Sequence, residues 1–314
     1  MHDSLHKSVL LQEAVDGLRI ERGDTVVDAT VGGAGHFLAL LDALNGTGTL
    51  IGIDADEDAI VRGEHAASTS SATEVHLVND NFRNLGAILD RLGVETVSKV
   101  LFDLGWSAYH LTAGRGFSFQ KEEPLLMTYG EPKEGTTAAD LINTAPEEKL
   151  SEILFTLGEE RFARQIARGI VETRSRSRIL TTGQLVDVIT KSTPSWYQHR
   201  RIHPATKTFQ ALRIAVNDEL GAVRDGLTAA IERLSEGGRV AVITFHSIED
   251  RVVKSMLRDA AYAGKGTVIT KKPIAPSEFE TKENPRARSA KLRIFERSSS
   301  DSPVNKILTA YAFA

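Results

Sequence analysis

Apolar and polar positions alternate in a regular order through about the first hundred residues. Short apolar runs have the length of buried strands, and each is followed by a segment whose apolar residues recur three and four positions apart. The expected strands are residues 25–30, 49–54, 75–78 and 97–102, with helices expected at 36–44, 57–67 and 82–92. Strands and helices that alternate in this way form βαβ units of a parallel sheet, so the pattern predicts an α/β fold.

The pattern changes after Asp103. Residues 106–145 have the composition of loops, and the spacing from 146 to about 235 is helical, with helices expected at 147–157, 159–174, 181–192 and 203–234, the last stopped by Gly237 and Gly238. A strand at 239–245, a helix at 247–258 and a strand at 291–295 then resume the first pattern. We therefore expect one α/β domain, residues 1–108 and 211–297, interrupted by a mostly helical insertion at 109–210 and followed by a tail at 298–314.

Acidic residues fall near the ends of the first four expected strands: Asp28, Asp54, Asp80 and Asp103. Ligands of open α/β sheets bind at the carboxyl ends of the strands, so these carboxylates mark the expected site. The turn at 32–35 is rich in glycine, which lets backbone N–H groups approach a ligand, and Asp54 can accept both hydroxyls of a ribose. Such a pair indicates either a dinucleotide site or an S-adenosylmethionine site. Leu38 stands where the dinucleotide fingerprint needs its third glycine, which disfavours a dehydrogenase.

The composition also shows how charge is distributed along the chain. The 314 residues carry a formal net charge of −4, which argues against a nucleic-acid binder held by net charge alone. The charge is unevenly spread, because residues 161–207 contain ten Lys or Arg against Glu172 and Asp187, and residues 282–297 contain six against two acids. Local basic surface is what phosphate backbones respond to, and a solvated helix face is the alternative interpretation.

Several classes of chemistry are excluded or disfavoured. The chain has no cysteine, which rules out disulfides and thiolate catalysis, and its nine histidines show no spacing typical of metal ligands, so we expect no metal site. No apolar run approaches the ~18 residues of a membrane span, and the first seven residues have no apolar signal region. We therefore expect a cytoplasmic protein without a membrane partner; the sequence leaves the oligomeric state open, a dimer included.

Eight short motifs occur in one order along nearly the whole chain. They are HKSVLLQE at 6–13, DATVGGAGH at 28–36, DLGWS at 103–107, RGFSF at 115–119, GEERFA at 158–163, HPAT and TFQA at 203–211, FHSIEDR at 245–251 and NPRARS at 284–289. In these motifs the chain resembles the RsmH/MraW family, the 16S rRNA cytosine-N4 methyltransferases. The resemblance implies a Rossmann-like sheet that binds S-adenosylmethionine, interrupted by a mostly helical domain that recognises the substrate.

The resemblance also implies individual cofactor contacts. They are Ala34, Gly35, His36, Asp54, Phe82, Asp103 and His110. His110 stands where the family usually has glutamine, and imidazole can also donate or accept a hydrogen bond. Ala34 replaces a glycine, and a contact through its backbone N–H survives that change if its φ is negative. Phe82 has a second interpretation, as a core residue that opens a helix.

The implied reaction is attack by the exocyclic N4 of cytosine on the methyl group of S-adenosylmethionine, expected by resemblance at cytosine 1402 of the decoding region. Asp103 is the first candidate to accept the amine hydrogens, with Ser107 assisting. The partner would be 16S rRNA or the small ribosomal subunit. The candidate RNA contacts are Arg115, His203, His246, Arg286 and Arg288. His246 and Ser247 have an alternative role as helix caps, for which serine is well suited.

One segment departs from the family. Residues 124–130 read PLLMTYG, where the family usually has two acids and an arginine within PLDMRMD. This departure keeps open an RNA-binding ribosome-assembly factor with weak or lost catalysis. An NAD-dependent oxidoreductase is the other alternative, against which the missing third glycine counts.

Overall fold

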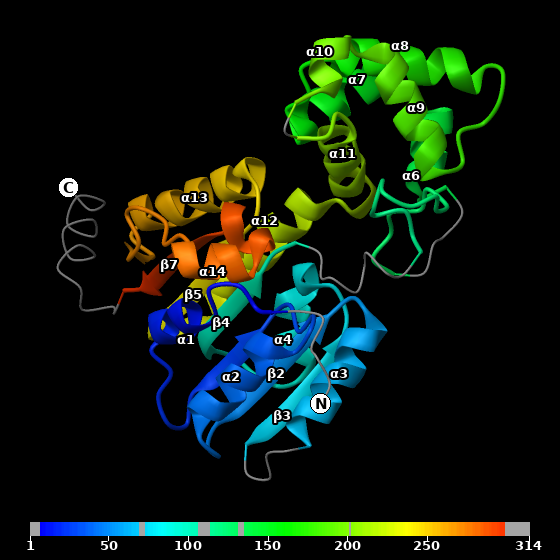
Figure 1. Ribbon diagram of the computed structural model, residues 1–314. Helices are drawn as coiled ribbons and strands as arrows, with labels where there is room; N and C mark the ends of the chain where they lie inside the picture. The colour runs from blue at the N-terminus through cyan, green and yellow to red at the C-terminus, as the bar shows by residue number, and fades with distance from the viewer. Residues whose placement is uncertain (1–6, 69–72, 106–113, 131–134, 201, 299–314) are drawn as a thin grey trace, which may run out of the picture. The chain divides into compact units, whose positions relative to one another are not determined.

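The computed structural model describes residues 7–68, 73–105, 114–130, 135–200 and 202–298 (Figure 1). The chain divides into two compact units: a sheet unit, residues 1–107 and 220–314, and a helical unit, residues 108–219. The division after Glu219 differs from the boundary expected at 210, because residue 210 lies inside an uninterrupted helix, α11 (Ala205–Asn217).

The described part of the sheet unit contains one seven-stranded sheet in the order β3-β2-β1-β4-β5-β7-β6. The strands are β1 (Thr25–Asp28), β2 (Thr49–Asp54), β3 (Glu74–Asn79), β4 (Val97–Asp103), β5 (Leu234–Thr244), β6 (Gly266–Val268) and β7 (Lys291–Arg297). Strands β1 to β5 are parallel, as expected, whereas β7 is antiparallel to both β5 and β6. The strand order reverses between β1 and β4, and a reversal of this kind is where open α/β sheets bind ligands.

The two faces of the sheet carry different helices because successive strand residues point to opposite sides. Val27, Val100 and Val242 pack with α4 (Leu85–Arg91), α12 (Glu219–Arg233) and α13 (Ser247–Tyr262). Their neighbours Val26, Leu101 and Ala241 pack with α1 (Leu11–Leu18) and α2 (Gly35–Leu44). The remaining helical elements of this unit are α3 (Glu57–Ala67), η1 (Phe82–Asn84), α14 (Glu278–Glu283) and η2 (Pro285–Ser289). Burial on both faces explains why the central strands read as continuous apolar runs.

The helical unit packs its helices around a separate apolar core that includes Leu154, Ile166 and Leu212. The helices in its described part are α6 (Ala138–Thr144), α7 (Glu147–Gly158), α8 (Ala163–Arg174), α9 (Thr182–Ser192), α10 (Ser195–Gln198) and α11. Helix α6 lies in a segment expected to be loop-like; Thr137 caps it and exchanges hydrogen bonds with Asp140.

Several expected helices differ at their ends. The helix expected at 159–174 begins at Ala163, because Glu159 adopts a left-handed conformation (φ 50°) that ends α7. The helix expected at 203–234 is two helices, separated at Asp218, which is also left-handed (φ 45°). The second of these ends at Arg233, before Gly237 and Gly238. The helix expected at 82–92 begins as the 3₁₀ turn η1. Left-handed residues end helices without any change in the apolar pattern, so periodicity did not reveal them.

Candidate active site

A buried histidine bridges two elements at the carboxyl edge of the sheet. His36 is the second residue of α2, which starts directly after the glycine-rich turn, and its side chain is 4% exposed. Its Nδ1 lies 3.3 Å from Oδ2 of Asp103, the last residue of β4, and its Nε2 lies 3.2 Å from the carbonyl oxygen of Val9. The carbonyl oxygen of Val9 can only accept a hydrogen bond, and so can a carboxylate oxygen of Asp103. The ring can therefore donate to both by carrying a proton on each nitrogen.

The electrostatics of His36 agree with this protonation. Burial lowers the pKa of the imidazole, but the charge of Asp103 and the hydrogen bond to it act in the opposite direction, and the net pKa lies above its ordinary value. With His36 at Oδ2, the other carboxylate oxygen of Asp103, Oδ1, is buried and has no hydrogen-bond partner among the described residues. An ionised carboxylate thus presents one unused acceptor at the end of β4.

Asp28 belongs to the same cluster, although nothing in its sequence position indicated a role beyond its place at the sheet edge. It ends β1 and is fully buried; Oδ1 accepts a hydrogen bond from the N–H of Thr30 (3.1 Å), and Oδ2 has no partner among the described residues. Burial raises the pKa of Asp28 to about 7, although the positive charge of His36 opposes the shift. Thr30 accepts from the N–H of Asp103 (2.8 Å), so it connects the two acidic residues.

The glycine-rich turn differs in one respect from what the sequence analysis assumed. Ala34 is left-handed (φ 63°), and its N–H donates to the carbonyl of Val31 at 2.7 Å. The assumed negative φ is therefore wrong, and the turn itself uses this N–H group. A Cβ atom at Gly35 would meet the hydroxyl of Ser8, so that side chain would have to move.

Asp54 ties the turn to the end of β2. Its Oδ2 accepts from the N–H of Gly32 (2.8 Å) and its Oδ1 from the N–H of Asp56 (2.9 Å). Burial raises the pKa of Asp54, and these two hydrogen bonds oppose the rise. Each carboxylate oxygen has a second lone pair, so the side chain retains acceptors for the hydroxyls of a ribose.

Phe82 packs partly into the core, and its role as a cofactor contact stays a prediction. Its ring is half-buried and packs edge-on against Phe102, with centroids 5.5 Å apart. A Cβ atom at Gly226 in α12 would lie 2.8 Å from this ring, so the glycine gives the ring its space. Part of the ring thus belongs to the core and part remains exposed. Ser107 and His110 lie outside the described residues.

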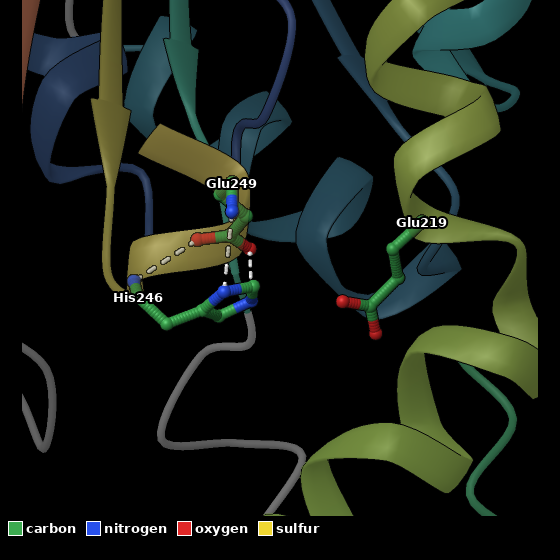
Figure 2. Close-up of side chains that lie close together, drawn as sticks. All are labelled: Glu219, His246 and Glu249. Atoms are coloured by element: carbon green, nitrogen blue, oxygen red, sulfur yellow. Dashed lines mark hydrogen bonds and ion pairs between the residues drawn. The ribbon is translucent and has the colours of Figure 1, made fainter. Parts of the chain in front are cut away.

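His246 is a helix cap. Its Nδ1 accepts from the N–H of Glu249 (3.3 Å), and Oε2 of Glu249 accepts from the N–H groups of Phe245 (2.9 Å) and His246 (3.3 Å), as Figure 2 shows for the pair. The N-cap of α13 is therefore His246, so the capping alternative holds for this residue, whereas Ser247 is the first residue of the helix. Nε2 of His246 lies 3.0 Å from Oε1 of Glu249.

The other candidate RNA contacts divide into two kinds. Arg115 donates from Nη1 to the carbonyls of Tyr129 (2.7 Å) and Gly130 (3.3 Å). His203 stacks on Phe119, with centroids 4.6 Å apart, and accepts from the N–H of Ala205; burial lowers its pKa. Arg286 and Arg288, in contrast, are exposed on η2.

The segment that departs from the family is part of a buried polar network in the helical unit. Tyr129 donates its hydroxyl hydrogen to Oε1 of Glu219 (2.8 Å), and Arg213 donates to both carboxylate oxygens of Glu219 (2.8 and 2.9 Å). Asn217 binds the backbone of Met127 and Tyr129 through its amide group. The tyrosine therefore has a structural partner that the sequence pattern alone did not indicate.

Strand order, strand-end acids and the tight turn before α2 together define a Rossmann-like α/β protein with the arrangement that binds nucleotide-type ligands. The model of one family, described as the MraW methylase family, matches residues 3–298, and the chain belongs to this family. The resemblance drawn from the motifs is thereby confirmed, and so is the expectation of a methyltransferase.

Curated relatives extend over nearly the whole chain. Ribosomal RNA small subunit methyltransferase H of Persephonella marina is 43% identical over 292 residues, which are 93% of this chain and 99% of that protein. The protein of the same name from Deinococcus radiodurans is 45% identical over 94% of this chain and 90% of its own length. Among solved structures, an rRNA methylase from Streptococcus thermophilus is 13% identical over 93% of this chain and 98% of its own, with a TM-score of 0.45.

Proposed function

We propose that this protein transfers a methyl group from S-adenosylmethionine to the exocyclic N4 of a cytidine in small-subunit rRNA, at the position corresponding to cytosine 1402. The observation that carries the proposal is the buried Oδ1 of Asp103, which has no hydrogen-bond partner in the described part of the chain and lies at the strand end next to the sheet's switch point. Membership of a methylase family and the names of the relatives support the reaction class and the rRNA substrate.

The cofactor would be held by residues around the glycine-rich turn. Asp54 retains lone pairs for the ribose hydroxyls, and the half-buried ring of Phe82 offers a face to the adenine. S-adenosylmethionine supplies an electrophilic methyl group on a positively charged sulfur and leaves as S-adenosylhomocysteine. The negative charge of Asp103 suits that positive sulfur.

Asp103 would act directly on the nucleophile. The lone pair of N4 is delocalised into the cytosine ring, so the nitrogen attacks only as it becomes pyramidal. Oδ1 of Asp103 accepts one amine hydrogen, which stabilises the positive charge that develops as the N–CH₃ bond forms and the S–CH₃ bond breaks. The extra proton on nitrogen then leaves to solvent or to the carboxylate.

His36 would act on Asp103 as a positioning residue. Its donated hydrogen bond fixes Oδ2, so that Oδ1 is the oxygen left for the substrate. The charge of Asp103 in turn raises the pKa of His36, so the ring and the carboxylate stabilise each other's position.

The RNA would be held by exposed cations. Arg286 and Arg288 on η2 are exposed, and in the helical unit Arg164, Arg176 and Lys191 make no ion pair with another described residue. These side chains can neutralise phosphates without reading sequence.

A ribosomal substrate places the protein in the cytoplasm. Among the described residues, no helix is both long and apolar enough to cross a bilayer.

A transfer experiment tests the proposal. Small subunits and free 16S rRNA, both prepared from cells that lack the modification, are incubated with the protein and methyl-labelled S-adenosylmethionine, and the label is mapped by nuclease digestion and mass spectrometry. We expect N4-methylcytidine at one position. Label on a different atom or base would refute the N4 assignment. RNA binding without transfer would favour the assembly factor that the departure at 126–130 kept open.

A further inference from the structure

A group of aromatic and cationic side chains lies on the surface of the helical unit, and none of its members is among the site residues named above. This group, called the aromatic platform below, consists of Arg161, Phe162, Trp196, Tyr197 and Arg200. Trp196 is 52% exposed, which is unusual for the largest apolar side chain. Its ring centroid lies 5.8 Å from that of Phe162 and 5.8 Å from that of Tyr197.

Buried hydrogen bonds fix the platform in place. Glu160 is fully buried and accepts from the hydroxyl of Tyr197 at 3.0 and 2.8 Å and from the N–H of Phe162 at 2.8 Å. Gln198 donates to the carbonyls of Thr190 (2.8 Å) and Thr193 (3.0 Å), which ties α10 to the end of α9. Trp196 directly precedes the two anchored residues, Tyr197 and Gln198. Its ring is therefore presented to solvent from a held backbone, which reduces the conformational entropy lost on binding a ligand.

Cations surround the rings. The guanidinium of Arg161 lies 5.5 Å from the centroid of Trp196 and 5.9 Å from that of Phe162, and that of Arg200 lies 5.6 Å from the centroid of Tyr197. Both arginines are exposed, and neither makes an ion pair with another residue in the described part of the chain. A partner for this surface has to offer a flat π system and negative charge together, which an apolar protein surface does not.

We propose that the aromatic platform is a stacking site for an unpaired base of the RNA substrate, with Arg161 and Arg200 on the adjoining phosphates. Proteins that bind single-stranded nucleic acids combine aromatic rings with a basic surface in this way. Bases within a duplex have no free face to offer, so the site selects single-stranded segments. This inference rests on the proposed function for the identity of the substrate as RNA.

Binding of a fluorescently labelled 12-nucleotide single-stranded RNA, measured by anisotropy without S-adenosylmethionine, tests the site. Trp196→Ala is expected to weaken binding by about 5- to 150-fold, the range found when one base loses its aromatic partner. Trp196→Phe, which retains a ring, should recover most of the loss. The matched control is Phe155→Ala, because Phe155 is 65% exposed on α7 of the same unit and has no ring or guanidinium contact among the described residues. This control should bind like the wild-type protein.

Salt separates stacking from phosphate contact. Removing the indole should leave the slope of log affinity against log salt unchanged, whereas Arg161→Gln should lower it by about one. The only other tryptophan is Trp106, so the variant Trp106→Phe has Trp196 as its single tryptophan. We expect RNA to quench the tryptophan fluorescence of this variant.

Two results would overturn the inference. Equal affinity of Trp196→Ala and wild type for single-stranded RNA would do so, as would a dimer seen by sedimentation that Trp196→Ala dissociates while RNA binding is unchanged. The methyl-transfer assay with small subunits is run in parallel. If methyl transfer proceeds but Trp196→Ala does not weaken RNA binding, only the platform is refuted. If Trp196→Ala weakens RNA binding but no methyl group is transferred, only the catalytic proposal is refuted.

Discussion

Two buried groups of charged side chains, one in each unit, differ in how completely their hydrogen bonds are satisfied. In the helical unit, Arg213 and Glu219 make two bonds at 2.8 and 2.9 Å, and Tyr129 adds a third. In the sheet unit, His36 and Asp103 meet at 3.3 Å, and one oxygen each of Asp28 and Asp103 has no partner among the described residues. Buried polar groups are normally paired, so an unpaired acceptor needs an explanation, and a ligand that supplies the donor is one.

The largest effect is expected where the satisfied group is broken. Arg213→Met leaves the carboxylate of Glu219 buried without its cation and should lower the free energy of unfolding by about 3–5 kcal/mol, measured by urea denaturation. The double variant Arg213→Met/Glu219→Gln should recover part of this loss. A single variant as stable as wild type would mean that the network contributes little to the helical unit.

Breaking the unsatisfied group should affect reactivity more than stability. Asp103→Asn keeps the shape of the side chain but loses the negative charge, and we expect methyl transfer to slow by about 10²- to 10³-fold, as when a single charge-stabilising group is removed elsewhere. The rate under saturating RNA and cofactor is the measurement, with thermal unfolding as the control. A rate within twofold of wild type would refute the role given to Asp103.

The pH dependence of stability sharpens the comparison. The pKa of Asp28 is raised from 3.8 to about 7, so between these values the folded protein holds a proton that the unfolded chain has released. Asp28 therefore lowers stability progressively from about pH 4 to pH 7, by about 1.4 kcal/mol per pKa unit. Asp28→Asn should remove this slope and be the more stable protein at pH 8, seen by urea denaturation across the range. Identical slopes would show that Asp28 ionises normally.

The contribution of His36 to stability depends on pH in the same direction. Its pKa in the folded protein is raised, so its contribution to stability is fully present below its unfolded pKa and is lost as the pH rises through the higher folded value. Nitrogen NMR of the imidazole should show protons on both Nδ1 and Nε2 at neutral pH. A neutral ring at that pH would refute the charged hydrogen bond from His36 to Asp103.

The smallest effect is expected at the exposed cations. Arg286→Gln removes one phosphate contact and should lower the slope of log RNA affinity against log salt by about one, without changing the stability of the fold. Arg293→Gln is a contrasting control, since this nearby arginine is buried and donates to Asp250 at 2.7 and 3.2 Å. It should reduce stability instead.

The sequence predicted those parts of the fold that depend on local pattern. The strand at 49–54 and the helix at 57–67 are found with the expected ends, because apolar spacing and the Asp56 cap are local signals. Helix α1 was not predicted. The antiparallel direction of β7 was not predicted either, because a strand carries no local record of the direction of its neighbour.

The candidate site was predicted in part for the same reason. Asp54 and Asp103 could be found because each ends a buried strand, whereas the contact between Asp103 and His36 joins residues distant in the chain. Charge counting was less reliable. Arg174 donates to the carbonyls of Ile142 and Ala145, and Arg168 lies 3.8 Å from Glu147, so several cations of the basic segment are occupied by partners outside it.

The pairing of β4 with β5 has a consequence for how the protein is made. The two strands are adjacent in the sheet, yet β4 ends at Asp103 and β5 begins at Leu234, with the helical unit between them. A ribosome that adds about 5–20 residues per second needs roughly ten seconds to pass from one to the other. During that interval β4 is an open edge of a half-built sheet, and such edges pair readily with foreign strands. Cells that synthesise this chain must therefore keep its nascent first third from aggregating until translation reaches β5.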